Sequence, residues 1–502
     1  MTRNIPAPKI KPPESSVPKL ARTSIPGITL LELSLFLSLW FLYGAVINSR
    51  NLEAFNLQQA GVEAIVERHH FSLEGSAEPR FQIKVYFDGD RPFGDTFLYK
   101  GRQYAAKQPG QFMASAVVYF FLRLFGLSYL NNYLLTSALV TFFTTSLVTA
   151  LAAVAVFRIV REFMRSDALA PPLACALGYG LATTAFVYSG IAYHDSLASG
   201  YLIIAFYLAV FVALRKPQGL TPRITAGAIG LLLGMTITTS MLPFFATGVI
   251  GLYLVSLRRW ELTLWTLAGG VVGLLPLLFF NAVSFGNPFL TSYMAGGYPE
   301  SFLHWDLSNS IQKLGFYFWQ ITLYVPIVWV GILGLAGYPR VLRRERFAIL
   351  AVFIAMAIQI LNIDSHGGCH YGPRFLLPVV PFACLGLAGF SYLRLRVIRL
   401  LTETAIGLVV AISFIVTLVG ALYGAMYCDT EVYAFWPYLA ALRTTGWKDM
   451  PLSIWLVLPF AVSVSLLVYS IHIYRRDSKG KGSREARFTA TNSDRPSSAV
   501  AQ

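Results

Sequence analysis

Charged residues are scarce in this sequence. Asp, Glu, Lys and Arg make up 13% of its 502 residues, whereas soluble domains carry roughly 25%. Hydrophobic residues make up 55%, and uncharged apolar runs long enough to cross a bilayer as a helix recur along the whole chain. This composition excludes a soluble globular protein. It predicts an all-α polytopic membrane protein built as one large helical bundle.

Cysteine is also scarce, with four residues in the chain. Cys175 and Cys384 fall in predicted spans, where we expect them to pack as small apolar side chains. Cys369 and Cys428 fall in predicted outer loops. An oxidising compartment would let them pair, but the sequence gives no distance between them, so their pairing stays open. There is no short-period repeat and no heptad pattern, which excludes a repeat protein and a coiled coil.

Apolar runs predict about 12 transmembrane helices. They cover residues 28–48, 133–157, 169–187, 197–214, 224–239, 241–257, 262–280, 314–337, 347–363, 375–392, 404–423 and 452–474. The stretch 224–257 is uncharged over 34 residues. As a single helix it would be about 51 Å long, against a hydrocarbon core of roughly 30 Å. Two short spans that meet near Ser240 and Pro243 are therefore expected.

The two ends of the chain differ in composition from the middle. Residues 1–26 are Pro-rich and basic, and residues 475–502 are rich in Ser, Arg and Gly. Both are predicted to be disordered cytoplasmic tails. Residues 27–474 then form the membrane domain. Its first apolar run lacks a clear cleavage signal, which indicates an uncleaved signal anchor.

Basic residues set the predicted orientation. With the N-terminal tail inside, 27 of the 40 Lys and Arg residues fall in cytoplasmic segments and four in short outer loops. The net charge of +15 is thus mainly a positive-inside signal and not a nucleic-acid footprint. If the apolar run 111–126 crossed the membrane, every later Arg-rich loop would lie outside. We therefore expect residues 50–132 to be a large first extracytoplasmic loop that carries interfacial helices, among them 111–126.

Ionisable and polar residues gather in the predicted outer loops. The candidate site residues are Glu53, Asp95, Tyr104 and Lys107 in the first loop, His194 and Asp195 in the next, Tyr293 in a third, and His370, Tyr371 and Arg374 in a fourth. Acids, bases and hydrogen-bond donors from separate loops on one face indicate a binding or catalytic site.

Several of these residues also have a structural interpretation. In FDGDRPFGDTF the acids Asp88, Asp90 and Asp95 fit a solvated turn as well as a general base or a metal-binding pair. Asp195 or Ser196 could cap the following helix.

The remaining candidates are equally open. Lys107 could meet lipid headgroups or a phosphate, and Arg374 could snorkel at the end of a span. His366, Cys369 and His370 form an H-x-x-C-H segment with metal-ligand spacing. No second cluster accompanies it, so we assign no metal site and leave a divalent metal open.

Three segments carry a family resemblance. YKGRQYAAKQPG resembles the Y-x-G-H-Y-Y-x-x-K-x-P-G segment of bacterial polyprenyl-phosphate-sugar glycosyltransferases. NAVSFGNPFLTSY and GGCHYGPRFLLP are similar to two later segments of the same group, in the same order. The group belongs to the C-type superfamily, which includes protein O-mannosyltransferases and the lipid A aminoarabinose transferase. With matching hydropathy, the resemblance covers roughly residues 28 to 400.

The resemblance implies an integral membrane glycosyltransferase of the inner (plasma) membrane with an extracytoplasmic site. Its donor would be a sugar on a polyprenyl phosphate, and its acceptor a glycan, a lipid or a protein. In the family a carboxylate of the first outer loop is the catalytic base, and the lysine of KxPG meets the donor phosphate, which assigns Lys107. Many relatives have Asp-Glu just after the first span. This chain has NSRNLEAF there, so Asp95 is our first choice as base and Glu53 the second.

Two other functions remain open at this stage. A transporter or flippase for lipid-linked glycans would also be polytopic, but it would place ionisable residues near mid-membrane. The predicted spans are nearly free of charge except for Glu32. An inactive relative that acts as an assembly partner would explain the missing Asp-Glu.

Overall fold

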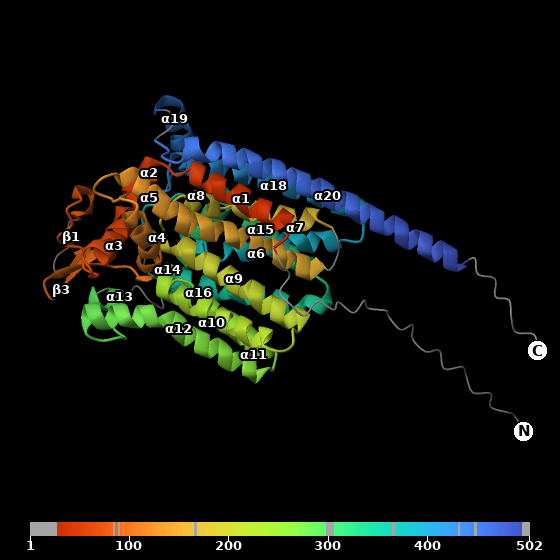
Figure 1. Ribbon diagram of the computed structural model, residues 1–502, viewed down its shortest axis with the longest axis horizontal. Helices are drawn as coiled ribbons and strands as arrows, with labels where there is room; N and C mark the ends of the chain where they lie inside the picture. The colour runs from red at the N-terminus through yellow and green to blue at the C-terminus, as the bar shows by residue number, and fades with distance from the viewer. Residues whose placement is uncertain are drawn as a thin grey trace, which may run out of the picture.

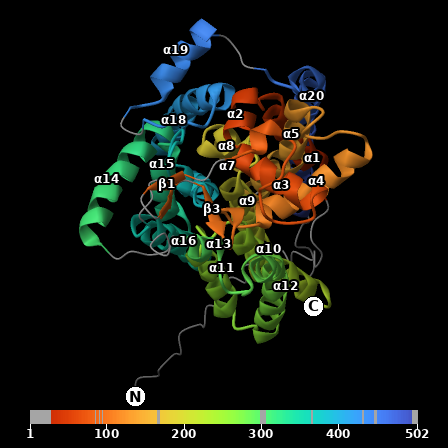
Figure 2. The ribbon, with the colours of Figure 1, turned by 90° about the vertical axis from the view of Figure 1, so that its left-hand side faces the viewer.

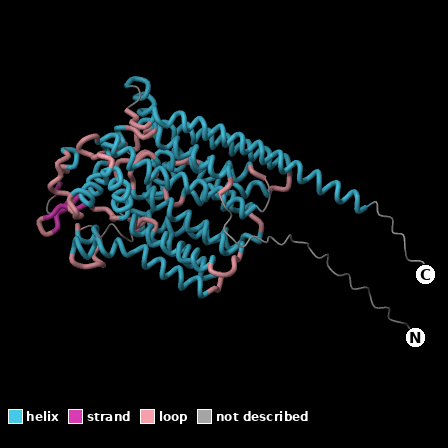
Figure 3. Tube along the Cα trace, in the orientation of Figure 1, coloured by secondary structure: helices cyan, strands magenta, loops and turns pink. Residues whose placement is uncertain are grey.

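Long helices run side by side in a bundle, and shorter elements gather at one of its ends (Figure 1, Figure 3). This computed structural model describes residues 28–83, 86–88, 91–93, 95–164, 168–297, 306–363, 367–429, 432–445 and 449–493.

The first half of the chain contains α1 (Leu30–Ala45), α2 (Ser49–Ala54), α3 (Asn56–Glu67), α4 (Gly110–Leu124), α5 (Tyr133–Thr141), α6 (Leu147–Met164), α7 (Ala170–Leu181), α8 (Thr184–Ser189), α9 (His194–Arg215), α10 (Thr221–Thr239) and α11 (Phe244–Ser256). The second half contains α12 (Trp260–Phe285), α13 (Ser292–Ala295), α14 (Leu307–Tyr324), α15 (Ile327–Gly334), α16 (Arg343–Leu361), α17 (Val380–Gly386), α18 (Arg396–Tyr423), α19 (Phe435–Thr445) and α20 (Ser453–Ser493). Short irregular turns of helix are η1 (Pro79–Phe81), η2 (Phe142–Ser146), η4 (Leu335–Gly337), η5 (Arg340–Leu342), η6 (Arg374–Leu376) and η7 (Leu387–Tyr392).

Five helical segments of the described chain are long and apolar enough to cross a membrane. They are Tyr133–Met164, His194–Arg215, Trp260–Phe285, Arg396–Tyr423 and Ser453–Arg476. A sixth span would be the pair Ser308–Tyr324 and Ile327–Gly337, whose two helices are bent by 100°. Helices occupy all twelve predicted segments, but the others do not combine that length and apolarity. The multi-pass helical fold is confirmed, and the number of twelve spans is not.

The predicted break inside 224–257 is confirmed. α10 ends at Thr239, the backbone is extended at Ser240, and α11 begins at Phe244 after Pro243. α10 then packs backbone-to-backbone on α12. A Cβ atom at Gly230 would lie 1.9 Å from the carbonyl oxygen of Thr266. Only glycine permits this approach, and close packing of this kind holds helices together where lipid removes the hydrophobic driving force.

The first loop contains strands that we did not predict. β1 (Tyr86–Asp88) pairs with β2 (Arg91–Phe93), and β3 (Thr96–Tyr99) pairs with β4 (Arg102–Ala105), both antiparallel. The β3–β4 hairpin turns at Lys100 and Gly101, whose φ angles are 48° and 76°. This two-residue turn with positive φ matches strand twist and closes a tight hairpin.

The predicted interfacial helix at 111–126 forms as α4 at the same end of the bundle as the hairpins (Figure 2). Its apolar residues Val117, Phe120, Phe121 and Leu124 are exposed. Its buried face includes Phe112, Ala116 and Tyr119, and the exposed Arg123 near its end pairs with Glu67 of α3 at 3.3 Å. The helix therefore has the two-sided character expected of an interfacial element.

The C-terminal helix runs further than expected. α20 continues to Ser493, past residue 475 where we predicted a disordered tail, and it projects beyond the bundle (Figure 1). Once a helix has formed, each added residue gains a backbone hydrogen bond without a new nucleation cost, which favours such an extension. Residues 494–502 and the predicted tail 1–26 lie outside the described residues.

Candidate active site

The open end of the β3–β4 hairpin brings Asp95 and Lys107 together. The strands pair Thr96 with Ala105, and the Ala106 N–H donates to the Asp95 carbonyl at 2.7 Å. The residues that flank this pairing therefore lie opposite each other. Lys107 Nζ donates to Asp95 Oδ1 at 2.6 Å. The lysine side chain is 10% exposed, whereas the Asp95 side chain is 64% exposed and can meet an incoming molecule.

This ion pair sets the charge of both groups. The Lys107 ammonium lowers the pKa of Asp95 below its ordinary value, and the charge of Arg374 acts in the same direction, although partial loss of hydration of the carboxylate opposes both. Burial lowers the pKa of Lys107, but Asp95 and Tyr293 outweigh it, and the net pKa is raised. Both groups are consequently charged at neutral pH, as a base and a phosphate-binding cation must be.

The KQPG segment, residues 107–110, packs against α10 and α13. A Cβ atom at Gly110 would lie 2.7 Å from Thr239 Cα, so the start of α4 sits directly on the end of α10. Ser292 of α13 donates a hydrogen bond to the Lys107 carbonyl at 3.0 Å. α4 begins at Gly110, and Pro109 is its N-cap residue. Lys107 is thereby fixed between β4 and α4.

Arg374 belongs to the same cluster, although it lies far from Lys107 in the sequence. It begins η6, and its guanidinium carbon lies 5.3 Å from the centre of the Tyr193 ring. Its charge acts on both Asp95 and Lys107. Burial disfavours its charged form, but the surrounding Tyr193 and Asp195 outweigh this and the pKa of Arg374 is raised. Arg374 is thus a permanent cation that contacts Tyr193 and whose charge acts on the Asp95–Lys107 pair.

His194 and Asp195 open α9 at this cluster. His194 Nε2 lies 3.5 Å from Asp195 Oδ1, and Ser240 Oγ donates to the same oxygen at 2.7 Å. The N-cap of α9 is Tyr193, without a side-chain cap, and Ser196 Oγ donates to the Tyr188 carbonyl. The capping interpretation of Asp195 and Ser196 is therefore wrong. Asp195 is tied to the α10–α11 break because Ser240, not an orphan backbone N–H, is its partner.

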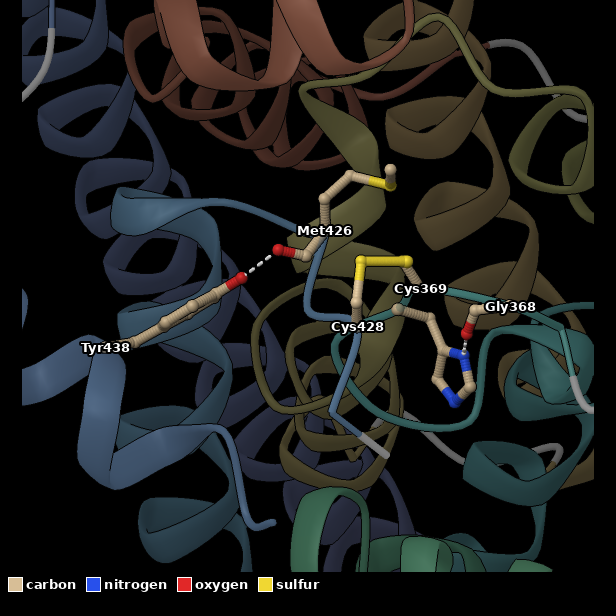
Figure 4. The surroundings of a disulfide bond; sticks show 6 residues. Gly368, Cys369, Met426, Cys428 and Tyr438 are labelled. Atoms are coloured by element: carbon tan, nitrogen blue, oxygen red, sulfur yellow. Dashed lines mark hydrogen bonds between the residues drawn. A yellow bond between two sulfur atoms is a disulfide. The ribbon is translucent and has the colours of Figure 1, made fainter. Parts of the chain in front are cut away.

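Cys369 and Cys428 form a disulfide bond, which answers the pairing question that the sequence left open (Figure 4). Two backbone hydrogen bonds accompany it: the N–H of His370 donates to the Tyr427 carbonyl and that of Tyr371 to the Ala425 carbonyl, each at 2.8 Å. The segment that leads to Arg374 is thereby fastened to the segment after α18.

The disulfide also bears on the H-x-x-C-H segment. Cys369 has no free thiolate to offer a metal, and His366 lies outside the described residues. His370 Nδ1 contacts the Gly368 carbonyl. In the part of the chain that the structure describes, no group of three or more His, Cys, Asp and Glu residues is placed to hold a metal ion.

Three candidates lie elsewhere. Glu53 is exposed on α2. Tyr104 is buried against Phe97 and Phe285 and anchors the hairpin to the end of α12. Tyr371 is fully buried, and its hydroxyl donates to the Val416 carbonyl at 2.8 Å. The structure brings Asp95, and not Glu53, to Lys107.

Tyr293 joins the cluster as expected. It lies on α13, and its hydroxyl is under the influence of Lys107, Asp195 and Asp95. Burial raises its pKa, with the nearby Lys107 acting against this. Tyr293 is thus a neutral hydrogen-bonding group at neutral pH.

The sequence interpretation missed several residues of the cluster. Tyr193 supports Arg374, Ser240 holds Asp195, and Gln108 follows Lys107 in a fully buried position. Among the described residues, no hydrogen-bond partner is found for the Gln108 amide, the Tyr193 hydroxyl, Asp195 Oδ2 or Arg374 Nε. Buried polar atoms normally have partners, so such a concentration around two cations indicates a site for a polar ligand. Only the position of Gln108 within KQPG could have drawn attention to it beforehand.

Comparison with known proteins gives distant structural similarities. No protein-family model and no curated protein matches the sequence. The chain is similar to ArnT from Cupriavidus metallidurans bound to undecaprenyl phosphate, with a TM-score of 0.47, 15% identity, and coverage of 88% of this chain and 76% of that one.

Archaeal structures are similar at a comparable level. The oligosaccharyltransferase AglB from Archaeoglobus fulgidus, in complex with an inhibitory peptide and a dolichol-phosphate, has a TM-score of 0.42 and 13% identity over 79% of this chain and 56% of that one. The apo Archaeoglobus fulgidus oligosaccharyltransferase has a TM-score of 0.43 and 12% identity over 83% and 57%. This chain thus spans little more than half the length of the archaeal proteins. At these identities and TM-scores, the similarity assigns no activity to it.

Proposed function

We propose that this protein is an integral membrane glycosyltransferase that moves a sugar from a polyprenyl-phosphate donor to an acceptor hydroxyl. The observation that carries the proposal is the Asp95–Lys107 ion pair beside Arg374, at one end of a membrane bundle. It combines a solvent-exposed carboxylate with two fixed cations, which are the groups that this transfer requires.

The chemistry follows from these groups. The oxygen of the acceptor hydroxyl bonds to the anomeric carbon of the donor sugar as the bond from that carbon to the phosphate oxygen breaks. The hydroxyl proton goes to the Asp95 carboxylate, and the bonding electron pair leaves with the polyprenyl phosphate. Lys107 and Arg374 stabilise the negative charge of the departing phosphate, Lys107 as a point charge and Arg374 through paired hydrogen bonds.

Because of this ion pair, binding of the donor changes the basicity of Asp95. With no donor bound, Lys107 holds Asp95 at 2.6 Å and keeps its pKa low, which makes it a weak base. A donor phosphate competes for the same ammonium group. Once it takes Lys107, Asp95 is released toward the acceptor and its pKa rises toward the ordinary value.

We assign supporting roles to the other polar residues of the cluster. His194, Asp195 and Tyr293 contact the sugar or the phosphate, and His370 lines the approach beside the disulfide. Tyr104 and Tyr371 act through packing, because both are buried among aromatic side chains. The proposal names no metal; a titration with chelator decides whether a divalent ion adds to the charge of Lys107 and Arg374.

We place the site on the extracytoplasmic side of the plasma membrane. The Cys369–Cys428 disulfide supports this because such bonds persist in oxidising compartments. The excess of Lys and Arg in the loops of the opposite end supports it independently. Membrane-impermeant labelling of a cysteine introduced at Asp95 in intact cells tests this sidedness.

Two alternative functions, a transporter and an inactive relative, are less well supported by the structure. A transporter would hold ionisable groups near mid-membrane, but Glu32 lies in the first turn of α1 and accepts two hydrogen bonds of 3.0 Å from Arg158. An inactive relative would lack a usable base, whereas Asp95 is exposed beside Lys107.

The test uses the full chain in proteoliposomes with radiolabelled polyprenyl-phosphate sugars extracted from metabolically labelled bacterial membranes. A transferase moves label to a new covalent product. A flippase moves label across the bilayer with its bond unchanged, and an inactive relative does neither.

A further inference from the structure

A basic cavity of about 400 Å³ lies between the ends of α9 and α11 and the starts of α12 and α16. Three cations line it, Lys216, Arg259 and Arg344, and each comes from a different connection between helices. Lys216 and Arg344 are exposed and Arg259 is half-buried, so all three can meet a ligand. A cavity of this size is within the range of ligand pockets. The other lining residues are Val212, Ala213, Pro217, Gln218 and Leu257.

The basic cavity is separate from the candidate active site. α9 begins at that site with His194, and its 22 residues end at Arg215, which is about 33 Å away along the helix. α11 also starts beside the site, because Ser240, shortly before it, donates a hydrogen bond to Asp195. Both helices run from there to the opposite end of the bundle (Figure 1). The cavity therefore lies at the other end from the Asp95 carboxylate.

The carboxylates near the cavity have other partners. Glu261 pairs with Arg223 in a neighbouring cavity that shares Arg259. Glu345, next to Arg344 in α16, is buried and accepts a hydrogen bond of 2.9 Å from the Tyr253 hydroxyl. Within the described chain, no ion pair joins any of the three lining cations to a carboxylate. Like charges that face one cavity repel each other, and a bound anion removes this repulsion.

The orientation signal alone does not account for this convergence. Basic residues are expected at a cytoplasmic face whatever their arrangement, and the adjacent Arg258 and Arg343 serve that purpose without lining the cavity. Lys216 is the C-cap of α9 with a φ of 48°, a left-handed conformation at which glycine usually stands. A lysine at this costlier position favours a use for its side chain.

The surroundings favour a lipid as the source of the anion. Leu252 of α11 and Trp260 of α12 are 69% and 67% exposed, and tryptophan is enriched where a membrane meets water. Arginine binds phosphate through paired hydrogen bonds and lysine as a point charge. The Gln218 amide adds a neutral donor. Basic pockets between membrane helices on the cytoplasmic side are typical binding sites for phosphate-bearing lipid headgroups.

We propose that Lys216, Arg259 and Arg344 bind the phosphate group of an anionic phospholipid at the end of the bundle opposite to the candidate active site. The two arginines hold the phosphate oxygens, Lys216 adds its charge, and Gln218 donates to the headgroup. With the sidedness proposed above, this lipid belongs to the cytoplasmic leaflet. The inference does not depend on the transfer reaction, because the cavity shares no residue with the Asp95–Lys107 cluster.

Lipid titration monitored by native mass spectrometry tests the cavity with defined probes. The purified full chain is titrated with phosphatidylglycerol, which is anionic, and with phosphatidylcholine, whose phosphate carries a compensating cation. We expect phosphatidylglycerol to be retained at concentrations at which phosphatidylcholine is not. Glycerol 3-phosphate, a soluble phosphate ester, serves as a competitor and should not displace the lipid. Displacement at a concentration equal to that of the lipid would overturn the assignment to a lipid.

Paired variants separate the cavity from the general surface charge. Arg259→Gln/Arg344→Gln should weaken phosphatidylglycerol binding by about tenfold or more, because bonds between charged groups are lost. The matched control, Arg258→Gln/Arg343→Gln, removes the same charge one residue away on each segment and should keep the wild-type affinity. Arg344→Gln alone, at an exposed position, repeats the test with a milder change. Thermal unfolding without added lipid should be unchanged, since these arginines lose no ion pair.

Three outcomes would overturn the proposal. Equal weakening in the two double variants would show that the lipid responds to surface charge and not to the cavity. Equal affinity of wild-type protein for both phospholipids would show that no anion site exists. A loss in Lys107→Met as large as in Arg259→Gln/Arg344→Gln would place the bound phosphatidylglycerol at the candidate active site. The transfer assay is independent of all three, so the proposed function can fail while the lipid site stands.

Discussion

Removal of the Lys107 charge tests the proposed chemistry most directly. In Lys107→Met the methylene chain is largely kept, while the ammonium group 2.6 Å from Asp95 is lost. Loss of one charge-stabilising donor costs about 2.7–4 kcal/mol in the transition state, which predicts a decrease in transfer rate of about 10²- to 10³-fold.

The same substitution should leave the fold intact. The Asp95 side chain is 64% exposed, so the ion pair is solvent-screened on that side and contributes at most about 1 kcal/mol to stability. Met removes a buried ammonium and fills its place with an apolar group. We therefore expect the midpoint of thermal unfolding to stay within about 2 °C of the wild type.

The assay measures label transferred from radiolabelled polyprenyl-phosphate sugars in proteoliposomes, with thermal unfolding of the same preparation. Lys100→Met is the matched control, because Lys100 is an exposed lysine at the turn of the same hairpin. A Lys107→Met protein with normal unfolding and wild-type transfer would refute the reasoning. An equal loss in Lys100→Met would show that the charge of the loop matters and not the position of Lys107.

Three further predictions follow from the cluster. Asp95→Asn should lower the transfer rate by about 10²-fold or more, as expected for a general base, while Glu53→Gln should retain at least half of the activity. A larger loss in Glu53→Gln than in Asp95→Asn in the same assay would assign the base to Glu53. The pKa of Asp95 is lowered from its ordinary value of 3.8 in the free protein and rises only toward that value when a donor takes Lys107. The carboxylate therefore stays deprotonated between pH 5 and 8, and a pH–rate profile should show no acid limb from Asp95 in that range. An acid limb in that range that moves to higher pH in Asp95→Glu would contradict this. The disulfide of Cys369 and Cys428 closes a loop with a sequence separation of 59 residues and should contribute about 2–4 kcal/mol to stability. The Cys369→Ser/Cys428→Ser variant should unfold at a lower temperature and bind undecaprenyl phosphate more weakly, because the segment that carries Arg374 is released. Unchanged affinity would show that this segment holds its position without the bond.

Residues of the three resembling segments meet in the fold, but the segments alone did not decide which carboxylate lies beside Lys107. Lys107 of KQPG and Arg374 of YGPRF come from two of these segments, and the charges of both act on Asp95. The carboxylate was ambiguous, since Glu53 and Asp95 both occur in the same loop. Only the hairpin pairing separates them, and it places Asp95 beside Lys107 and leaves Glu53 exposed on α2.

By itself, the sequence determined the membrane class, the gathering of polar loops at one end of the bundle, the break near Ser240 and the separate helix that forms as α4. These are properties of local composition and hydropathy, which a run of about 20 residues carries without reference to the rest of the chain.

The tertiary structure alone decided which of these groups touch. The contacts of Asp195 with Ser240 and of Cys369 with Cys428 join residues 45 and 59 positions apart. Contacts of this kind depend on how helices pack against each other, where small residues allow close approach, and hydropathy does not encode that geometry.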